Sequence, residues 1–204
     1  MQNNTIAAAM PGFGTKTILA AAVAAVISTG AFAATSAEAL VVNGTEQSIA
    51  DQNFFDLTSD AAGTAVNASN GAKVTLTNVT FTNNTSNLPK SGSTNQNAGG
   101  ALAASVSGTT VTATNVTYAN NKATAGNGGA LAISDATYAQ RGGSLSGNSA
   151  MGGGALSISG GSASFTDVAF TDNTATGFGG AIMADKAAKL GYFIPSVSRR
   201  ESPS

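Results

Sequence analysis

Residues 168–182 read Val-Ala-Phe-Thr-Asp-Asn-Thr-Ala-Thr-Gly-Phe-Gly-Gly-Ala-Ile and hold the pattern that decides the fold. A large apolar residue is followed three places later by Asn, and Gly-Gly-Ala with an aliphatic residue comes next. Because this pair of motifs recurs in a fixed order, it indicates stacked copies of one unit. The four copies contain Phe81, Asn84, Gly99 and Gly100; Tyr118, Asn121, Gly128 and Gly129; Leu145, Asn148, Gly153 and Gly154; and Phe170, Asn173, Gly179 and Gly180.

The glycine pairs give the length of the repeating unit. They begin at residues 99, 128, 153 and 179, so the successive steps are 29, 25 and 26 residues. Residues 85–98 form an insertion rich in Ser, Thr and Asn, which predicts a surface loop. A period in the mid-twenties fits a leucine-rich repeat or one coil of a parallel β-helix, and Leu is too scarce here for the former.

Short segments within each unit alternate apolar with small polar residues. Val74-Thr75-Leu76 and Val111-Thr112-Ala113 are two examples, and this period of two is typical of a strand with one buried face. We find no helical period of ten or more residues between positions 71 and 184. The sequence therefore predicts an all-β solenoid, a short parallel β-helix of about four coils.

Aligned copies predict rows of like residues, spaced about 4.8 Å apart from coil to coil. Stacked aromatic rings and ladders of Asn amides are favourable at that spacing. We expect the motif Asn and the Gly pair at corners, because both tolerate left-handed backbone angles. The third copy is degenerate, since Gln140, Gly142 and Gly143 stand where the first copy has Leu, Asn and Val, and this predicts a bulge or a weak strand.

The sequence divides into four segments. Residues 1–33 have a single Lys16, an apolar core and a small-x-small end, which predicts a signal peptide cleaved after Ala33, or alternatively after Ala39. The rival interpretation, a membrane anchor, is disfavoured because the apolar run is short and dominated by Ala. We expect a cap or partial coil over 34–70, the repeats over 71–184, and a non-repetitive, disordered tail over 185–204.

Composition excludes several classes of function. Charged residues make up 9% of the chain and the formal net charge is −1, so no basic patch is present to bind nucleic acid. The chain has no Cys and no His, which excludes disulfides, thiol chemistry, Ser-His mechanisms and metal sites built on these residues. We therefore expect no cofactor and no metal site. Low net charge with many β-branched residues also argues against a disordered chain.

Some parallel β-helices are polysaccharide-active enzymes, which would require clustered acidic and basic residues. Two of the candidates align with asparagines of earlier copies and are interpreted as turn residues. No second carboxylate stands beside them in neighbouring copies, so we expect no catalytic site and no enzyme. A second rival is an ice-binding or crystal-binding solenoid, but the outward row of Thr is broken in the last two copies. The candidates for the enzymatic site are Asp135, Arg141, Asp167 and Asp172.

The pairing of F-x-x-N with G-G-A-[ILV] over residues 71–184 resembles the repeats of the bacterial polymorphic outer-membrane proteins, which are autotransporter-type surface proteins. Two copies depart from the pattern, with Tyr118 and Leu145 in place of Phe. The resemblance implies a right-handed β-helix passenger that is exported to the cell outer membrane or beyond the cell. It also implies a non-enzymatic role in adhesion or surface recognition, or as a structural stalk.

The partner implied by this resemblance is a component of a host cell, of the matrix or of a neighbouring cell surface. A membrane barrel needs at least eight strands of about ten residues, and the sequence leaves no room for one. We therefore expect a truncated passenger fragment that reaches the outer membrane only through a translocator missing from this chain.

Overall fold

The computed structural model describes residues 37–60, 62–88 and 96–193. The signal peptide expected over residues 1–33 lies outside these ranges. Every regular element within these ranges is a strand. The described residues therefore include no helix that could cross a membrane.

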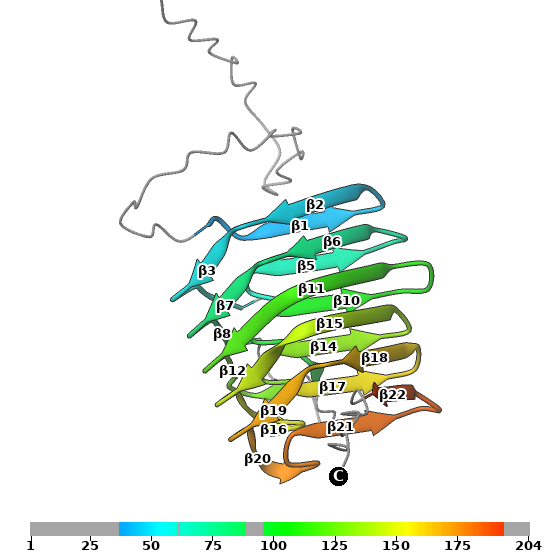
Figure 1. Ribbon diagram of the computed structural model, residues 1–204. Coiled ribbons are helices and arrows are strands. Elements are labelled where there is room, and N and C mark those ends of the chain that lie inside the picture. The colour runs from blue at the N-terminus through cyan, green and yellow to red at the C-terminus, as the bar shows by residue number, and fades with distance from the viewer. Residues whose placement is uncertain (1–36, 61, 89–95, 194–204) are drawn as a thin grey trace, which may run out of the picture.

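The strands form three parallel sheets that wind into a solenoid (Figure 1). Each coil contributes to the first sheet, then the second, then the third. The first sheet contains β1 (Leu40–Asn43), β5 (Val66–Ser69), β10 (Leu102–Ser105), β14 (Leu131–Ser134), β17 (Leu156–Ser159) and β21 (Ile182–Asp185).

The second sheet holds the longest strands of the molecule. Its main path contains β2 (Glu46–Ala50), β6 (Lys73–Thr77), β11 (Thr110–Ala119), β15 (Thr137–Ser146), β18 (Ser162–Thr166) and β22 (Lys189–Phe193). Shorter strands continue the coil beyond a bend, namely β3 (Asn53–Phe55), β7 (Thr80–Thr82) and β19 (Ala169–Thr171).

The third sheet consists mostly of two-residue strands and closes each coil. It contains β4 (Thr58–Ser59), β8 (Thr85–Ser86), β9 (Gln96–Asn97), β12 (Lys122–Ala123), β13 (Gly126–Asn127), β16 (Ser149–Gly152) and β20 (Thr174–Phe178). The prediction of an all-β parallel solenoid is therefore confirmed.

The solenoid is longer than the expected four coils. The six strands of the first sheet are separated by five turns. The expected partial coil is a full one, in which Leu40 pairs with Val66 and Phe54 with Phe81. Beyond Asp185, where a disordered tail was expected, β22 pairs in register with β18. Both additions follow from backbone hydrogen bonds between parallel strands, which need no Gly-Gly-Ala motif.

One row of large apolar side chains runs through the core. The rings of Phe54, Phe81 and Tyr118 stack with centroids 5.1 and 4.8 Å apart, and the register continues the row through Leu145 to Phe170. All of these side chains are buried except that of Phe170, which is partly exposed near the end of the solenoid. Phe54 belongs to this row although its coil carries no complete motif.

The degenerate third copy forms no weak strand, because β15 runs unbroken over ten residues. The buried amide of Gln140 donates to the carbonyls of Val116 and Gly142, at 2.8 and 3.0 Å. Its oxygen accepts from the hydroxyl of Tyr138 at 2.7 Å, and that hydroxyl lies 3.1 Å from the hydroxyl of Tyr118. This network satisfies the polar side chain that replaces an apolar one. The expected irregularity lies at Gly142 and Gly143, which both have a positive φ and are absent from the pairing of β15 with β18 and β19.

The left-handed corners lie one residue away from where they were expected. The motif asparagines have ordinary backbone angles, and the residue before each of them has a positive φ, as in Asn83 (55°) and Asn120 (54°). The two glycines of a pair also differ in role. Gly128 has φ +79°, whereas Gly129 is required by crowding, because an added Cβ would lie 2.0 Å from the carbonyl oxygen of Gly154.

Candidate functional site

The sequence-derived acidic and basic candidates do not all gather at one place, although Arg141 pairs with Thr166, the residue before Asp167. Asp135 follows β14, Asp167 follows β18 and Asp172 follows β19, while Arg141 is exposed on β15. All three aspartates have a positive φ, from 52° to 58°. They therefore occupy turn positions, as the alignment with asparagines predicts for Asp167 and Asp172.

The rows that contain Asp167 and Asp172 hold carboxylates at the other end of the solenoid too. Asp51 and Asp56 occupy the same two corner rows in the first coil, a signal that the motif search missed. Each of these carboxylates accepts a hydrogen bond from the amide of the next coil, from Asn78 at 3.0 Å and from Asn83 at 3.1 Å. Asp51 and Asp56 thus serve as ends of side-chain ladders, whereas Asp167 and Asp172 follow Gly142 and Gly147 in these rows, which offer no side-chain donor.

A buried ladder is formed by the four motif asparagines. The amide nitrogen of Asn121 donates to the side-chain oxygen of Asn148 and to the carbonyl of Phe81, both at 3.0 Å. Its own oxygen accepts from the backbone and the side chain of Asn84, again at 3.0 Å. The same contacts extend the ladder to Asn173. The role of these residues is structural, because the ladder uses their polar atoms inside the coil.

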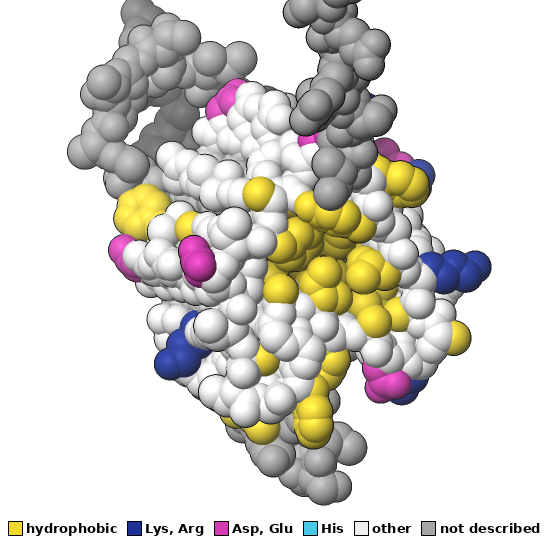
Figure 2. All heavy atoms as spheres, turned by 60° about the horizontal axis from the view of Figure 1, so that its bottom comes forward, with side chains coloured by type: hydrophobic (Ala, Val, Ile, Leu, Met, Phe, Trp, Pro, Cys, Tyr) yellow, Lys and Arg dark blue, Asp and Glu magenta, His cyan; other side chains and the backbone are white. Residues whose placement is uncertain are grey.

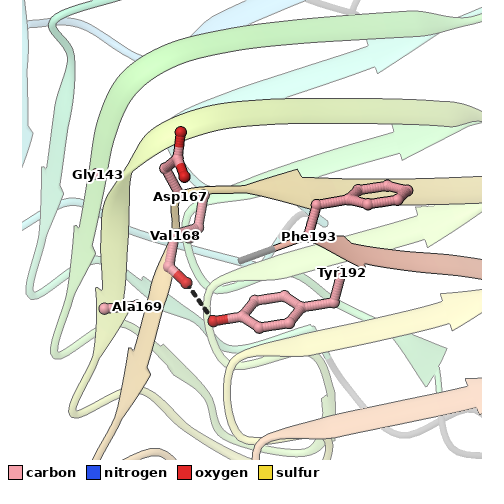
Figure 3. Close-up of a pocket in the computed structure, with 6 residues that line it drawn as sticks. All are labelled: Gly143, Asp167, Val168, Ala169, Tyr192 and Phe193. Atoms are coloured by element: carbon pink, nitrogen blue, oxygen red, sulfur yellow. Dashed lines mark hydrogen bonds between the residues drawn. The ribbon is translucent and has the colours of Figure 1, made fainter. Parts of the chain in front are cut away.

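A hollow of about 290 Å³ lies near the last coil, and Figure 3 shows the residues that line it. The hydroxyl of Tyr192 donates to the carbonyl of Val168 at 2.6 Å, and the carboxylate of Asp167 is turned away from that hydroxyl. Aromatic and acidic groups therefore do not converge on one point. The hollow is lined by Gly143, Asp167, Val168, Ala169, Tyr192 and Phe193.

The last coil also exposes apolar side chains. Phe193 is 61% exposed, and Figure 2 shows hydrophobic side chains gathered on the end of the molecule that comes forward in that view. The large apolar residues exposed on this coil are Phe178, Leu190, Tyr192 and Phe193.

A larger hollow of about 670 Å³ lies at the corner between the first and second sheets. It contains one carboxylate, that of Asp135, together with three serines. Two-carboxylate glycoside hydrolysis needs a pair of acidic groups, and each hollow is lined by only one. The lining residues are Ser105, Val106, Ser107, Ser134, Asp135 and Gly161.

Charged groups are sparse over the described part of the chain. The ion pair found there joins Lys73 to Glu46 at 2.6 Å, on exposed side chains. The hydrogen bond from the Lys73 ammonium, with its charge, lowers the pKa of the Glu46 carboxyl. Among the same residues no three Asp or Glu side chains lie close enough to hold a metal ion.

The outer face of the second sheet is covered by hydroxyl side chains. Thr75 and Thr112 are neighbours in one outward row, and Thr77 and Thr114 in the next. Both rows are interrupted one coil later by Ala139 and Arg141. The break that the sequence predicts for an ice-binding face lies in another row, where Thr80 and Thr117 are followed by Ser144 and Ala169.

Two segments of the chain match the Chlamydia polymorphic membrane protein repeat, residues 78–105 and residues 167–185. The first ends with strand β10 and the second with β21, and each contains one F-x-x-N and one G-G-A-aliphatic motif. Comparisons with curated proteins and with solved structures give no match. Two of the four motif copies, which stack in register along the parallel solenoid, are thus similar to the repeats of the polymorphic membrane proteins.

Proposed function

We propose that the chain is a passenger segment of an autotransporter-like surface protein, which acts without catalysis by adhesion or surface recognition, or as a stalk. The repeat match supports a location at the outer membrane or outside the cell. The observation that carries the proposal is the hydroxyl-rich face of the second sheet. This sheet is continuous from coil to coil, with one parallel strand after another. Stacked repeats provide extended surfaces of this kind for binding partners.

The filled interior supports a role for the surface. The coil interior holds a large continuous cluster of buried apolar side chains, from Val42 to Val168, and a small second cluster of Ala98, Ala123 and Ala150. The two hollows described above are shallow features of the outside, at a corner and at an end. Binding is therefore expected to spread over several coils, with no polar side chain indispensable.

The test compares binding and catalysis in the same variants. Beads coated with the chain are incubated with host cells and with extracellular matrix, and sugar release from acidic polysaccharides is measured in parallel. Four variants replace one charged side chain each by Ala. We expect saturable binding, changed by less than about tenfold in each variant, and no sugar release. Sugar release that disappears in one variant would overturn the proposal in favour of an enzyme. The four positions are Asp135, Arg141, Asp167 and Asp172.

Export is a separate part of the proposal. Protein recovered from the periplasm or the medium should begin at Ala34 or at Leu40, because signal peptidase cleaves after a small-x-small sequence. N-terminal sequencing measures this directly. A full-length product found only in the cytosol would contradict export.

A further inference from the structure

The hollow around Asp135 results from unequal turns in three successive coils. The turn between β10 and β11 contains four residues, 106–109, whereas the turns of the next two coils contain two each, 135–136 and 160–161. The longer turn projects beyond its neighbours. Gly160 and Gly161 have no side chains to fill the space below it, so an open hollow of about 670 Å³ remains. This volume is within the range of about 300–1,000 Å³ that is usual for ligand sites.

Asp135 is the one charged residue that lines this hollow, and its carboxylate has no partner among the described residues. Its neighbours in the corner row are Val106 and Gly160, which offer no side-chain donor. Gly160 makes room for the carboxylate, because a Cβ there would lie 2.1 Å from its Oδ1. The corner carboxylate Asp51 differs, since it accepts a hydrogen bond from Asn78 of the next coil. The acceptor capacity of Asp135 is thus available to a ligand.

The part of the hollow next to Asp135 is held in an unusual backbone conformation. Val106 has φ +75°, which is rare for a β-branched residue, and its side chain is 48% exposed. Two backbone hydrogen bonds fix it, from its N–H to the carbonyl of Ser134 at 2.9 Å and from the N–H of Thr109 to its carbonyl at 3.1 Å. This part is therefore preorganised, and it places the adjacent serines, Ser105 and Ser107, at the edge of the hollow.

We propose that this hollow binds a neutral pyranose of a surface glycan. Vicinal sugar hydroxyls can donate to the Asp135 carboxylate, and serine hydroxyls both donate and accept, so the lining matches a polyol. A basic side chain fits less well, because an exposed pair with a single carboxylate contributes little in water. The inference rests on the proposed recognition function, within which the hollow is one contact among several.

The experiment titrates methyl glycosides of glucose, galactose and mannose into the full-length, isotope-labelled chain and follows backbone amide signals by NMR. We expect saturable shifts at Ser107, Asp135 and Gly161 for at least one glycoside. Asp135→Asn should weaken that binding at least tenfold. This variant should fold, because Asn70 occupies the same corner row with φ 56°. Asp172→Asn is the matched control, since it removes the same charge at another left-handed corner and should change nothing.

A second variant tests the hollow independently of charge. Ser107→Phe places a large side chain on an exposed turn residue and should abolish the shifts by filling the space. The proposal is overturned if no glycoside produces localised shifts, or if the two Asp→Asn variants behave alike. It is also overturned if N-acetyl-lysine amide, in place of the glycosides, gives the Asp135-dependent shifts. Cell binding that persists without sugar shifts would refute the hollow alone, whereas sugar shifts without cell binding would refute the recognition function.

Discussion

Replacing Asn121 by Ala should unfold or severely destabilise the solenoid. The side chain is fully buried and makes four hydrogen bonds that join three coils. Its oxygen accepts from the backbone N–H and from the amide of Asn84, so truncation leaves two N–H groups of Asn84 without these partners. A buried polar group left unsatisfied costs about 1–3 kcal/mol. The two together give an expected loss of about 2–6 kcal/mol, out of a total stability of about 5–15 kcal/mol for a typical protein.

The measurement is equilibrium unfolding in urea, followed by far-UV circular dichroism. Asn120→Gly is the matched control, because Asn120 is exposed at a left-handed corner and Gly147 occupies the same row in the next coil. The control should lose less than about 1 kcal/mol, since glycine adopts positive φ without strain. If Asn121→Ala loses no more than this control, the buried ladder does not stabilise the fold as argued.

Three further substitutions or conditions test other parts of the structure. Gly129→Ala should prevent cooperative folding, because its Cβ would lie 2.0 Å from a carbonyl of the next coil; a native far-UV spectrum with a normal melting transition would contradict this. Phe81→Ala should cost about 3–5 kcal/mol, and Phe170→Ala clearly less because its ring is partly exposed; equal shifts in thermal melting would refute this account of the stack. Burial raises the pKa of Tyr118 and Tyr138 well above the value of about 10 in the unfolded chain. Their contribution to stability is therefore complete below about pH 10 and is lost as pH rises above it, and ultraviolet absorbance should show the two ionising only as the chain unfolds.

Where the sequence predicted the fold well, the same residue type had to recur at the same place in every coil. Phe81 and Tyr118 could be aligned because parallel coils place equivalent residues in one row. The alignment even placed Gln140 correctly beside Ala113, in the row that begins with Leu76. The sequence did not predict that β15 would extend over ten residues with Gln140 in its core row. The side-chain oxygen of Gln140 accepts a hydrogen bond from the hydroxyl of Tyr138, and this contact exists only in the folded strand.

The full extent of the first coil and strand β22 were missed for a different reason. A motif marks positions where crowding or a buried hydrogen bond permits one residue type, as at Gly129. Strand pairing itself is made by backbone groups, which every residue except proline supplies in full. The first coil, whose motif is incomplete, can therefore stack in full, whereas the sequence indicates only a cap or a partial coil there.

By itself, the sequence determined the all-β class, the period and the composition of the rows, because each depends on residue types repeated along the chain. The tertiary structure alone decided the exact corners, the ladder partners and the hollow at Asp135. That hollow depends on Val106, Asp135 and Gly161, which are brought together by one turn of four residues and two turns of two. Such a juxtaposition arises from how coils of unequal length stack, and no local pattern encodes it.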